Sequence, residues 1–239
     1  MKRDKSFKII DLIFPPVCPF CGSPAGAFSE YGADTECPGC RGRLMRYKKA
    51  DEIPHEALEK VLRLYVPVRY YGLAKQAMLR YKFGQEQWLY KPFSDIMHGF
   101  LTDNRGYEDI DIITSVPISK KRYAKRGYDQ SRLIARRLSE LSGKPYRDLL
   151  KRNDRAGAMI ATSSENYAER NAEKRFSAVN DELELYGLRV LLVDDIFTTG
   201  STLNECAGIL LGHGAMYVNA ACMMSGRQDI FDPAAEEIA

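Results

Sequence analysis

The chain has 239 residues, enough for one large domain or for a standard domain with a small additional module. Its 45% hydrophobic and 28% charged residues exclude collagen-like, mucin-like and wholly disordered classes, and its net charge of +3 points to no particular partner. The first sixteen residues begin like a signal peptide, but Asp11 interrupts the apolar part and no small-residue cleavage site precedes Cys18. No apolar run reaches the ~18 residues of a spanning helix, so we expect a cytoplasmic protein with no membrane span.

Four of the six cysteines form two C-x2-C pairs near the start of the chain, fifteen residues apart: Cys18, Cys21, Cys37 and Cys40. Disulfides are disfavoured in the cytosol, whereas this spacing is typical of tetrahedral zinc–thiolate sites. We therefore predict a structural Zn²⁺ in an N-terminal module spanning residues 1–43. An iron–sulfur cluster or a redox pair is the competing interpretation.

From residue 44 onwards, strand-like and helix-like segments alternate, which predicts one doubly wound α/β domain spanning residues 44–239. Strands are expected at 64–71, 110–116, 146–150, 188–193 and 216–224. Helices are expected at 72–83, about 86–101, 123–141 and 201–211, with a possible helix start near 51–54. The polar stretch at about 151–176 is too long for a simple connector and predicts a mobile functional loop.

The most specific motif is VLLVDDIFTTGST, residues 190–202, where an apolar strand runs into Asp194 and Asp195. In an open α/β sheet, ligands bind beyond the carboxyl ends of the strands. The hydroxyl and N–H groups of the following turn suit a phosphate dianion, while the two carboxylates suit sugar hydroxyls or a hydrated Mg²⁺. An ordinary helix cap explains one hydroxyl but not four beside two acids. The candidate phosphate-binding residues are Thr198, Thr199, Gly200, Ser201 and Thr202.

A second motif follows the strand expected at 110–116. Its turn, residues 116–119, precedes a run with eight basic residues and one acid between Ser119 and Arg137. Basic side chains beside a turn at a strand end suit a diphosphate, although a solvated basic helix face explains the charge about equally well. The turn therefore becomes a candidate only through its position after a parallel strand.

The segment at 190–202 resembles the loop that binds 5-phosphoribosyl 1-diphosphate (PRPP) in type I phosphoribosyltransferases. The cysteine pairs behind IIDLIFPP, the segment LRYKFG, VP followed by KRYAKRGYDQ, and DDIFTTGST together resemble the ComF/GntX family over about residues 9–224. The resemblance implies a type I phosphoribosyltransferase-like parallel sheet flanked by helices, with a small N-terminal four-cysteine zinc ribbon. It assigns PRPP or phosphate binding to Asp194, Asp195, Thr198, Thr199, Gly200, Ser201 and Thr202. It assigns a diphosphate loop to Val116, Pro117, Ile118 and Ser119, and it matches family positions at Lys82, Arg126 and Gln130.

The long loop departs from the family pattern. It reads RNDRAGAMIATSSENYAERNAEKRF, which lacks the usual glutamine and displaces an arginine. Because this loop covers the active site in phosphoribosyltransferases, the departure puts catalysis in question, and we assign no catalytic residue.

The resemblance implies a ComF-type protein that binds Mg-PRPP or a related phosphorylated ligand and takes part in DNA uptake during natural transformation. A different class of function is a non-catalytic module that holds single-stranded DNA with its basic run and docks on a helicase-like ATPase. A purine-salvage phosphoribosyltransferase is the third hypothesis, although such enzymes do not need a zinc ribbon.

Overall fold

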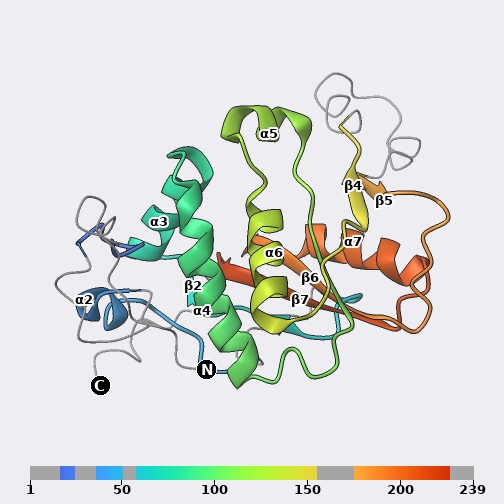
Figure 1. Cartoon of the computed structure of the whole chain (residues 1–239), viewed down its shortest axis with the longest axis horizontal. Helices are drawn as coiled ribbons and strands as arrows, with labels where there is room; N and C mark the ends of the chain where they lie inside the picture. The colour runs from blue at the N-terminus through green and yellow to red at the C-terminus, as the bar shows by residue number, and fades with distance from the viewer. Residues whose placement is uncertain (1–16, 25–35, 51–57, 155–174, 227–239) are drawn as a thin grey trace.

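The computed structural model of the chain describes residues 17–24, 36–50, 58–154 and 175–226 (Figure 1). A parallel sheet has the strand order β1-β7-β6-β3, and β2 also pairs with β7. Its strands are β1 (Leu64–Tyr65), β2 (Val68–Arg69), β3 (Ile112–Ser115), β6 (Arg189–Phe197) and β7 (Tyr217–Ser225). A separate antiparallel hairpin consists of β4 (Leu150–Arg152) and β5 (Phe176–Ala178). The helices are α2 (Pro38–Arg41), α3 (Gly72–Phe83), α4 (Tyr90–Asp103), α5 (Lys120–Arg126), α6 (Gln130–Ser142) and α7 (Ser201–Gly212).

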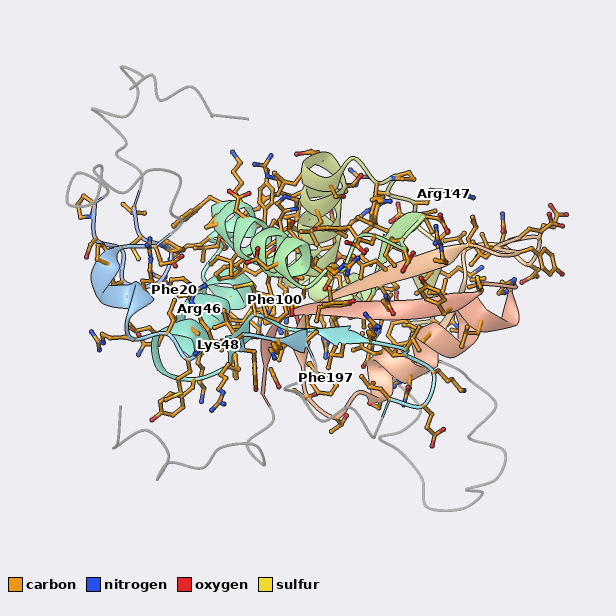
Figure 2. All side chains as sticks on the ribbon, turned by 90° about the horizontal axis from the view of Figure 1, so that it is seen from below. Phe20, Arg46, Lys48, Phe100, Arg147 and Phe197 are labelled. Carbon is orange, nitrogen blue, oxygen red and sulfur yellow. The ribbon has the colours of Figure 1, made fainter. Side chains whose placement is uncertain are left out.

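The sheet is covered on both faces. Along β6, Leu191 and Val193 belong to a hydrophobic cluster with α3, α4 and α6, whereas Val190 and Leu192 belong to a second cluster with α7. This alternation follows from the two-residue period of a strand, and burial on both faces explains why residues 190–193 are all apolar. Figure 2 shows α4 and α7 on opposite sides of the sheet. The expected doubly wound arrangement is confirmed. None of the helices in the described ranges combines the length and apolar character that crossing a bilayer requires.

Two expected elements are each divided by a local interruption. The helix expected at 123–141 begins earlier and forms α5 and α6, because Gly127 adopts a left-handed conformation with φ of 79°. Ser119 and Asp129 cap the two helices by accepting hydrogen bonds from the N–H groups of residues Arg122 and Arg132. The strand expected at 64–71 forms β1 and β2, with Pro67 between them, where the proline nitrogen offers no hydrogen.

The bounds of other helices and strands also differ from those expected from the sequence. A short 3-10 helix (Gln87–Leu89) precedes α4, and Tyr146 makes only an isolated bridge to Ile113 before β4 begins. The strand expected to end at residue 193 continues to Phe197, because β7 lies beside it and pairs with it over that length. The possible helix start near 51–54 and residues 155–174 of the expected loop lie outside the described residues.

The proposed division at residue 43 stays a prediction. Phe20 and Cys40 from the cysteine-rich segment belong to the same buried cluster as residues of α3 and α4, so this segment packs directly on the α/β core.

Candidate functional site

The two adjacent carboxylates lie near the carboxyl end of β6 and have different partners. Asp195 is 8% exposed, and its Oδ1 lies 2.9 Å from Nζ of Lys82, which comes from the last turn of α3. Oδ1 of Asp194 accepts hydrogen bonds from the Ser131 hydroxyl and from the Asp195 N–H, both at 2.8 Å. The pair is therefore held from two sides, by α3 and by the first turn of α6.

The environment of Asp194 favours its protonated form. Burial raises the pKa of this carboxyl well above its usual range, and the charge of Asp195 raises it further. The hydrogen bond from Ser131 and the charge of Lys82 act in the opposite direction. A proton or a cation supplied by a ligand would therefore be favourable at this position.

Arg126 and Gln130 extend the site beyond Lys82. The Arg126 guanidinium donates to Oε1 of Gln130 at 2.9 Å. Burial lowers the pKa of Arg126, and the charge of Asp195 acts in the opposite direction. Gln130 is fully buried, its backbone carbonyl accepts the Tyr81 hydroxyl at 2.9 Å, and its Nε2 finds no hydrogen-bond partner among the described residues. The three family positions Lys82, Arg126 and Gln130 therefore lie near one another, because Gln130 contacts both Arg126 and the residue before Lys82.

The turn at 198–202 leads from β6 into α7. Gly200 has φ of 81°, and a Cβ there would lie 2.6 Å from Cδ2 of Leu58, so both conformation and packing require glycine. Thr198, Thr199 and Ser201 are exposed, while Thr202 is partly buried. These hydroxyls, together with the N–H groups that begin a twelve-residue helix, form a surface suited to an anion.

Some polar groups of the turn at 116–119 already form hydrogen bonds within the protein. The Val116 N–H donates to the Val193 carbonyl at 2.9 Å, and the Ile118 N–H donates to Asp129 Oδ2 at 3.3 Å. Ser119 caps α5, whereas Pro117 keeps partial exposure. The structure places this turn after β3, the strand next to β6, so the two candidate turns leave adjacent strands.

The four predicted cysteines come together. Their sulfur atoms all lie within 4.8 Å of one another, and those of Cys21 and Cys37 are 3.6 Å apart. A tetrahedral zinc with bonds of about 2.3 Å places its thiolates roughly 3.8 Å apart, so the set fits Zn²⁺ and fills all four ligand positions. Such an ion would have a structural role, because it would keep no open position for substrate.

Ser131 is a site residue that the sequence analysis missed. Its hydroxyl reaches Asp194 only because α6 begins directly after the Asp129 cap and packs against β6. The sequence offered one signal, the position of Ser131 beside Gln130 at the start of a helix following the basic turn.

Sequence alignments with known proteins extend over most of this chain. It is 30% identical over 205 residues to competence protein ComFC of Streptococcus pneumoniae, a match that spans 82% of each chain. This chain belongs to the ComF family. ComFC of Bacillus subtilis is 28% identical over 206 residues, covering 83% of this chain and 72% of that protein. The DNA utilization protein YhgH of Salmonella typhi is 35% identical over 113 residues, and the match spans only about half of each chain.

The phosphoribosyl transferase domain family matches residues 123–238 of this ComF-family chain. Among solved structures, the allosteric regulatory enzyme of purine biosynthesis is 24% identical, with a TM-score of 0.41 over 56% of this chain and 26% of that one. A purine phosphoribosyltransferase from Pyrococcus horikoshii is 20% identical, with a TM-score of 0.35 over 58% of this chain and 73% of that one. The domain match and the parallel sheet with helices on both faces confirm the type I phosphoribosyltransferase-like fold.

Proposed function

We propose that this ComF-family protein binds Mg-PRPP or a related phosphorylated ligand and takes part in DNA uptake. The observation that carries the ligand proposal is the meeting of Asp194, Asp195 and Lys82 beside the exposed turn at 198–202. The role in DNA uptake is supported by the names of the relatives, a competence protein and a DNA utilization protein.

Each part of PRPP has a suitable group in this arrangement. The turn at 198–202 offers hydroxyl and N–H donors for the 5′-phosphate, and the two carboxylates offer acceptors for the ribose hydroxyls. The turn at 116–119, on the neighbouring strand, is the candidate for the diphosphate. Lys82 already neutralises Asp195 in the free protein, so a bound ligand shares this ion pair or displaces it.

The donor set also fits Mg²⁺ brought with the ligand, because this ion prefers carboxylate and phosphate oxygens in combination. When bound, it would neutralise charge on the diphosphate. In a transfer reaction the bond between ribose C1 and the diphosphate breaks, and positive charge grows on the sugar. Asp194 and Asp195 would stabilise that charge while the 198–202 turn fixes the phosphate end. The acceptor of the phosphoribosyl group stays unassigned.

Calorimetric titration of PRPP with Mg²⁺ tests the ligand proposal. Wild-type protein is expected to bind saturably, and the double variant Asp194→Asn, Asp195→Asn to bind at least about tenfold more weakly, because charged acceptors to the sugar are lost. Asp103→Asn, which removes an exposed carboxylate at the end of α4, should leave the affinity unchanged. Equal affinity in the wild-type protein and the double variant would remove the assignment.

Single-stranded DNA is a second candidate ligand, favoured by one surface feature. Phe83, beside Lys82, is 57% exposed, with the Arg126 guanidinium 5.0 Å and Lys125 Nζ 5.8 Å from its ring centroid. Aromatic rings next to cations bind single strands by stacking bases and neutralising phosphates. The adjoining α5 buries no side chain and is rich in lysine and arginine, so it would extend this contact. A helicase-like ATPase as partner belongs to this candidate.

Salt-dependent binding of an oligonucleotide tests the second candidate. The logarithm of the affinity should fall linearly with the logarithm of the salt concentration, and Phe83→Ala should weaken binding by about tenfold. Tyr186→Ala is the matched control, because Tyr186 is 80% exposed but precedes β6, at the end of the strand opposite the carboxylates. A flat salt dependence, or no binding at low salt, would exclude this function. Nucleotide formation from a free base and PRPP would instead support purine salvage.

A further inference from the structure

The turn between the first two cysteines is bound by a side chain of α3. Nη2 of Arg80, in the last turn of that helix, donates to the backbone carbonyls of Pro19 and Phe20, the second at 3.5 Å. The turn is closed by a hydrogen bond from the Gly22 N–H to the Cys18 carbonyl at 2.9 Å. Its shape decides whether the first two sulfur atoms can point at one metal ion. Arg80 therefore binds the main chain that positions two of the four candidate ligands.

The same residue helps to close the end of α3. The Arg80 carbonyl accepts the N–H of Gly84, the residue that caps the helix, at 2.7 Å. The contact is so close that a Cβ at position 84 would lie 2.8 Å from this carbonyl oxygen. A positive charge at a helix C-terminus also interacts favourably with the helix dipole. Lys82 lies inside this last turn, so the turn that presents its ammonium group to Asp195 depends in part on Arg80.

The last turn of α3 has a second support that does not involve the cysteines. Tyr81 is fully buried, and its hydroxyl donates to the Gln130 carbonyl at 2.9 Å. The Tyr128 hydroxyl in turn donates to the Tyr81 carbonyl. If these contacts alone held the turn, the state of the four cysteines would not affect it. The two supports therefore predict different results when metal is removed.

We propose that Arg80 couples metal binding by the four cysteines to the order of the last turn of α3. A turn fixed by metal–thiolate bonds holds the carbonyls of Pro19 and Phe20 where the guanidinium can bind them. Without those bonds the carbonyls lose their fixed positions, and α3 loses this support. Such coupling is reciprocal, so Arg80 must also raise the affinity of the cysteines for Zn²⁺. An effect on ligand binding through Lys82 rests on the proposed function, whereas the coupling itself does not.

Competition with a chromophoric zinc chelator tests the reciprocal effect. Arg80→Met keeps a long apolar stem and removes the donors, so its affinity for Zn²⁺ should fall by about tenfold or more, because charge-assisted hydrogen bonds are lost. Arg80→Lys keeps the charge without the planar fork, and its affinity should lie between those of Arg80→Met and the wild type. Thermal unfolding of each zinc-loaded variant checks that it is folded.

Arg147→Met is the matched control for these variants. Arg147 is an exposed arginine just before β4, and Figure 2 shows it well separated from Phe20. Its replacement should change the affinity for Zn²⁺ by less than about twofold, because it removes a guanidinium that does not contact the cysteine-rich turn.

Hydrogen exchange followed by mass spectrometry tests the effect on α3. Removing zinc from the wild type should speed exchange of the amides of residues 80–84 by about tenfold, whereas in Arg80→Met the change should be less than about threefold, because the link is already broken. The amides of α6 serve as the internal reference and should be unaffected by zinc removal.

Four results would overturn the proposal: no zinc binding by the wild type, equal zinc affinity in the wild type and Arg80→Met, exchange at 80–84 that ignores the metal, or equal acceleration in α6. The third would show that the contacts of Tyr81 hold the turn alone, and the fourth that zinc loss unfolds the domain as a whole. Neither experiment contains PRPP, so a failure of the ligand proposal would leave both results interpretable.

Discussion

Lys82 and Asp195 lie 113 residues apart in the chain and form one side of the candidate ligand site. The single ammonium group faces two adjacent carboxylates, so the free site holds more negative than positive charge at its centre. The raised pKa of Asp194 reduces this excess of negative charge, because it favours the neutral, protonated carboxyl. Residues that suit a ligand in this way commonly cost stability in the free protein.

The pH dependence of stability should reveal that cost. The raised pKa means that the folded protein holds the Asp194 proton more tightly than the unfolded chain, so this contribution is complete below the unfolded pKa. It is lost as the pH rises through the folded pKa. Asp194→Asn cannot ionise and keeps an Oδ1 acceptor for Ser131. We therefore expect the free energy of unfolding of this variant, relative to that of the wild type, to increase with pH. The increase should be about 1 kcal/mol or more between about pH 5 and about pH 8.5, measured by urea unfolding.

Asp103→Asn, at an exposed position, provides the control and should show no such pH-dependent gain. A difference between Asp194→Asn and wild type that stays constant across the same pH range would show that Asp194 ionises normally. The same substitution belongs to the ligand-binding test, so a more stable protein with weaker binding is the expected combination.

At the scale of elements, α3 connects the cysteine-rich segment to the candidate ligand site. Phe20, between the first two cysteines, is 2% exposed, and its ring centroid lies 6.2 Å from that of Phe93 on α4. Phe93 in turn contacts Tyr81 of α3 edge to face at 5.4 Å, and Tyr81 precedes Lys82. The Arg80 guanidinium donates to the backbone carbonyls of Pro19 and Phe20. Figure 2 shows Phe20 close to α2 and α3.

Phe20→Ala tests how strongly this packing holds the two parts together. Removing a fully buried ring leaves a cavity and should lower the free energy of unfolding by about 3–5 kcal/mol, measured by urea or thermal denaturation. If the wild type binds one equivalent of zinc, this variant should bind the same amount, because all four cysteines remain. Phe83→Ala, at the exposed end of α3, should cost less than about 1 kcal/mol. Equal losses in the two variants would show that Phe20 does not pack in the core.

At the scale of the whole molecule, local patterns predicted the order of elements and the sheet class. The apolar run in β6 predicted a buried strand, and the cysteine spacing predicted a metal site. Both predictions needed only residues that are close together in the sequence. The length of β6 could not be predicted in this way, because residues 194–197 extend only through pairing with β7. The β4–β5 hairpin was missed because its strands are three residues each and are separated in the sequence by a long polar segment.

The residues of the candidate site likewise fall into those that the sequence predicts and those that only the packing brings together. Asp194, Asp195 and the 198–202 turn follow one another in the chain, and their chemistry is visible without a structure. Lys82 and Gln130 were identified by resemblance alone, and Ser131 was not identified at all. The positions of all three depend on how α3 and α6 pack around β6, which is a tertiary property.

The strand order has a consequence for how the protein is made. β7, which hydrogen-bonds to β1, β2 and β6, is the last of the strands described here to leave the ribosome. At roughly 5–20 residues per second, about eight to thirty seconds separate the synthesis of β1 from that of β7. From the synthesis of α4 onwards, its apolar face has no β7 to pack against until that strand is made. The nascent chain therefore exposes apolar surface that favours aggregation until β7 has been made.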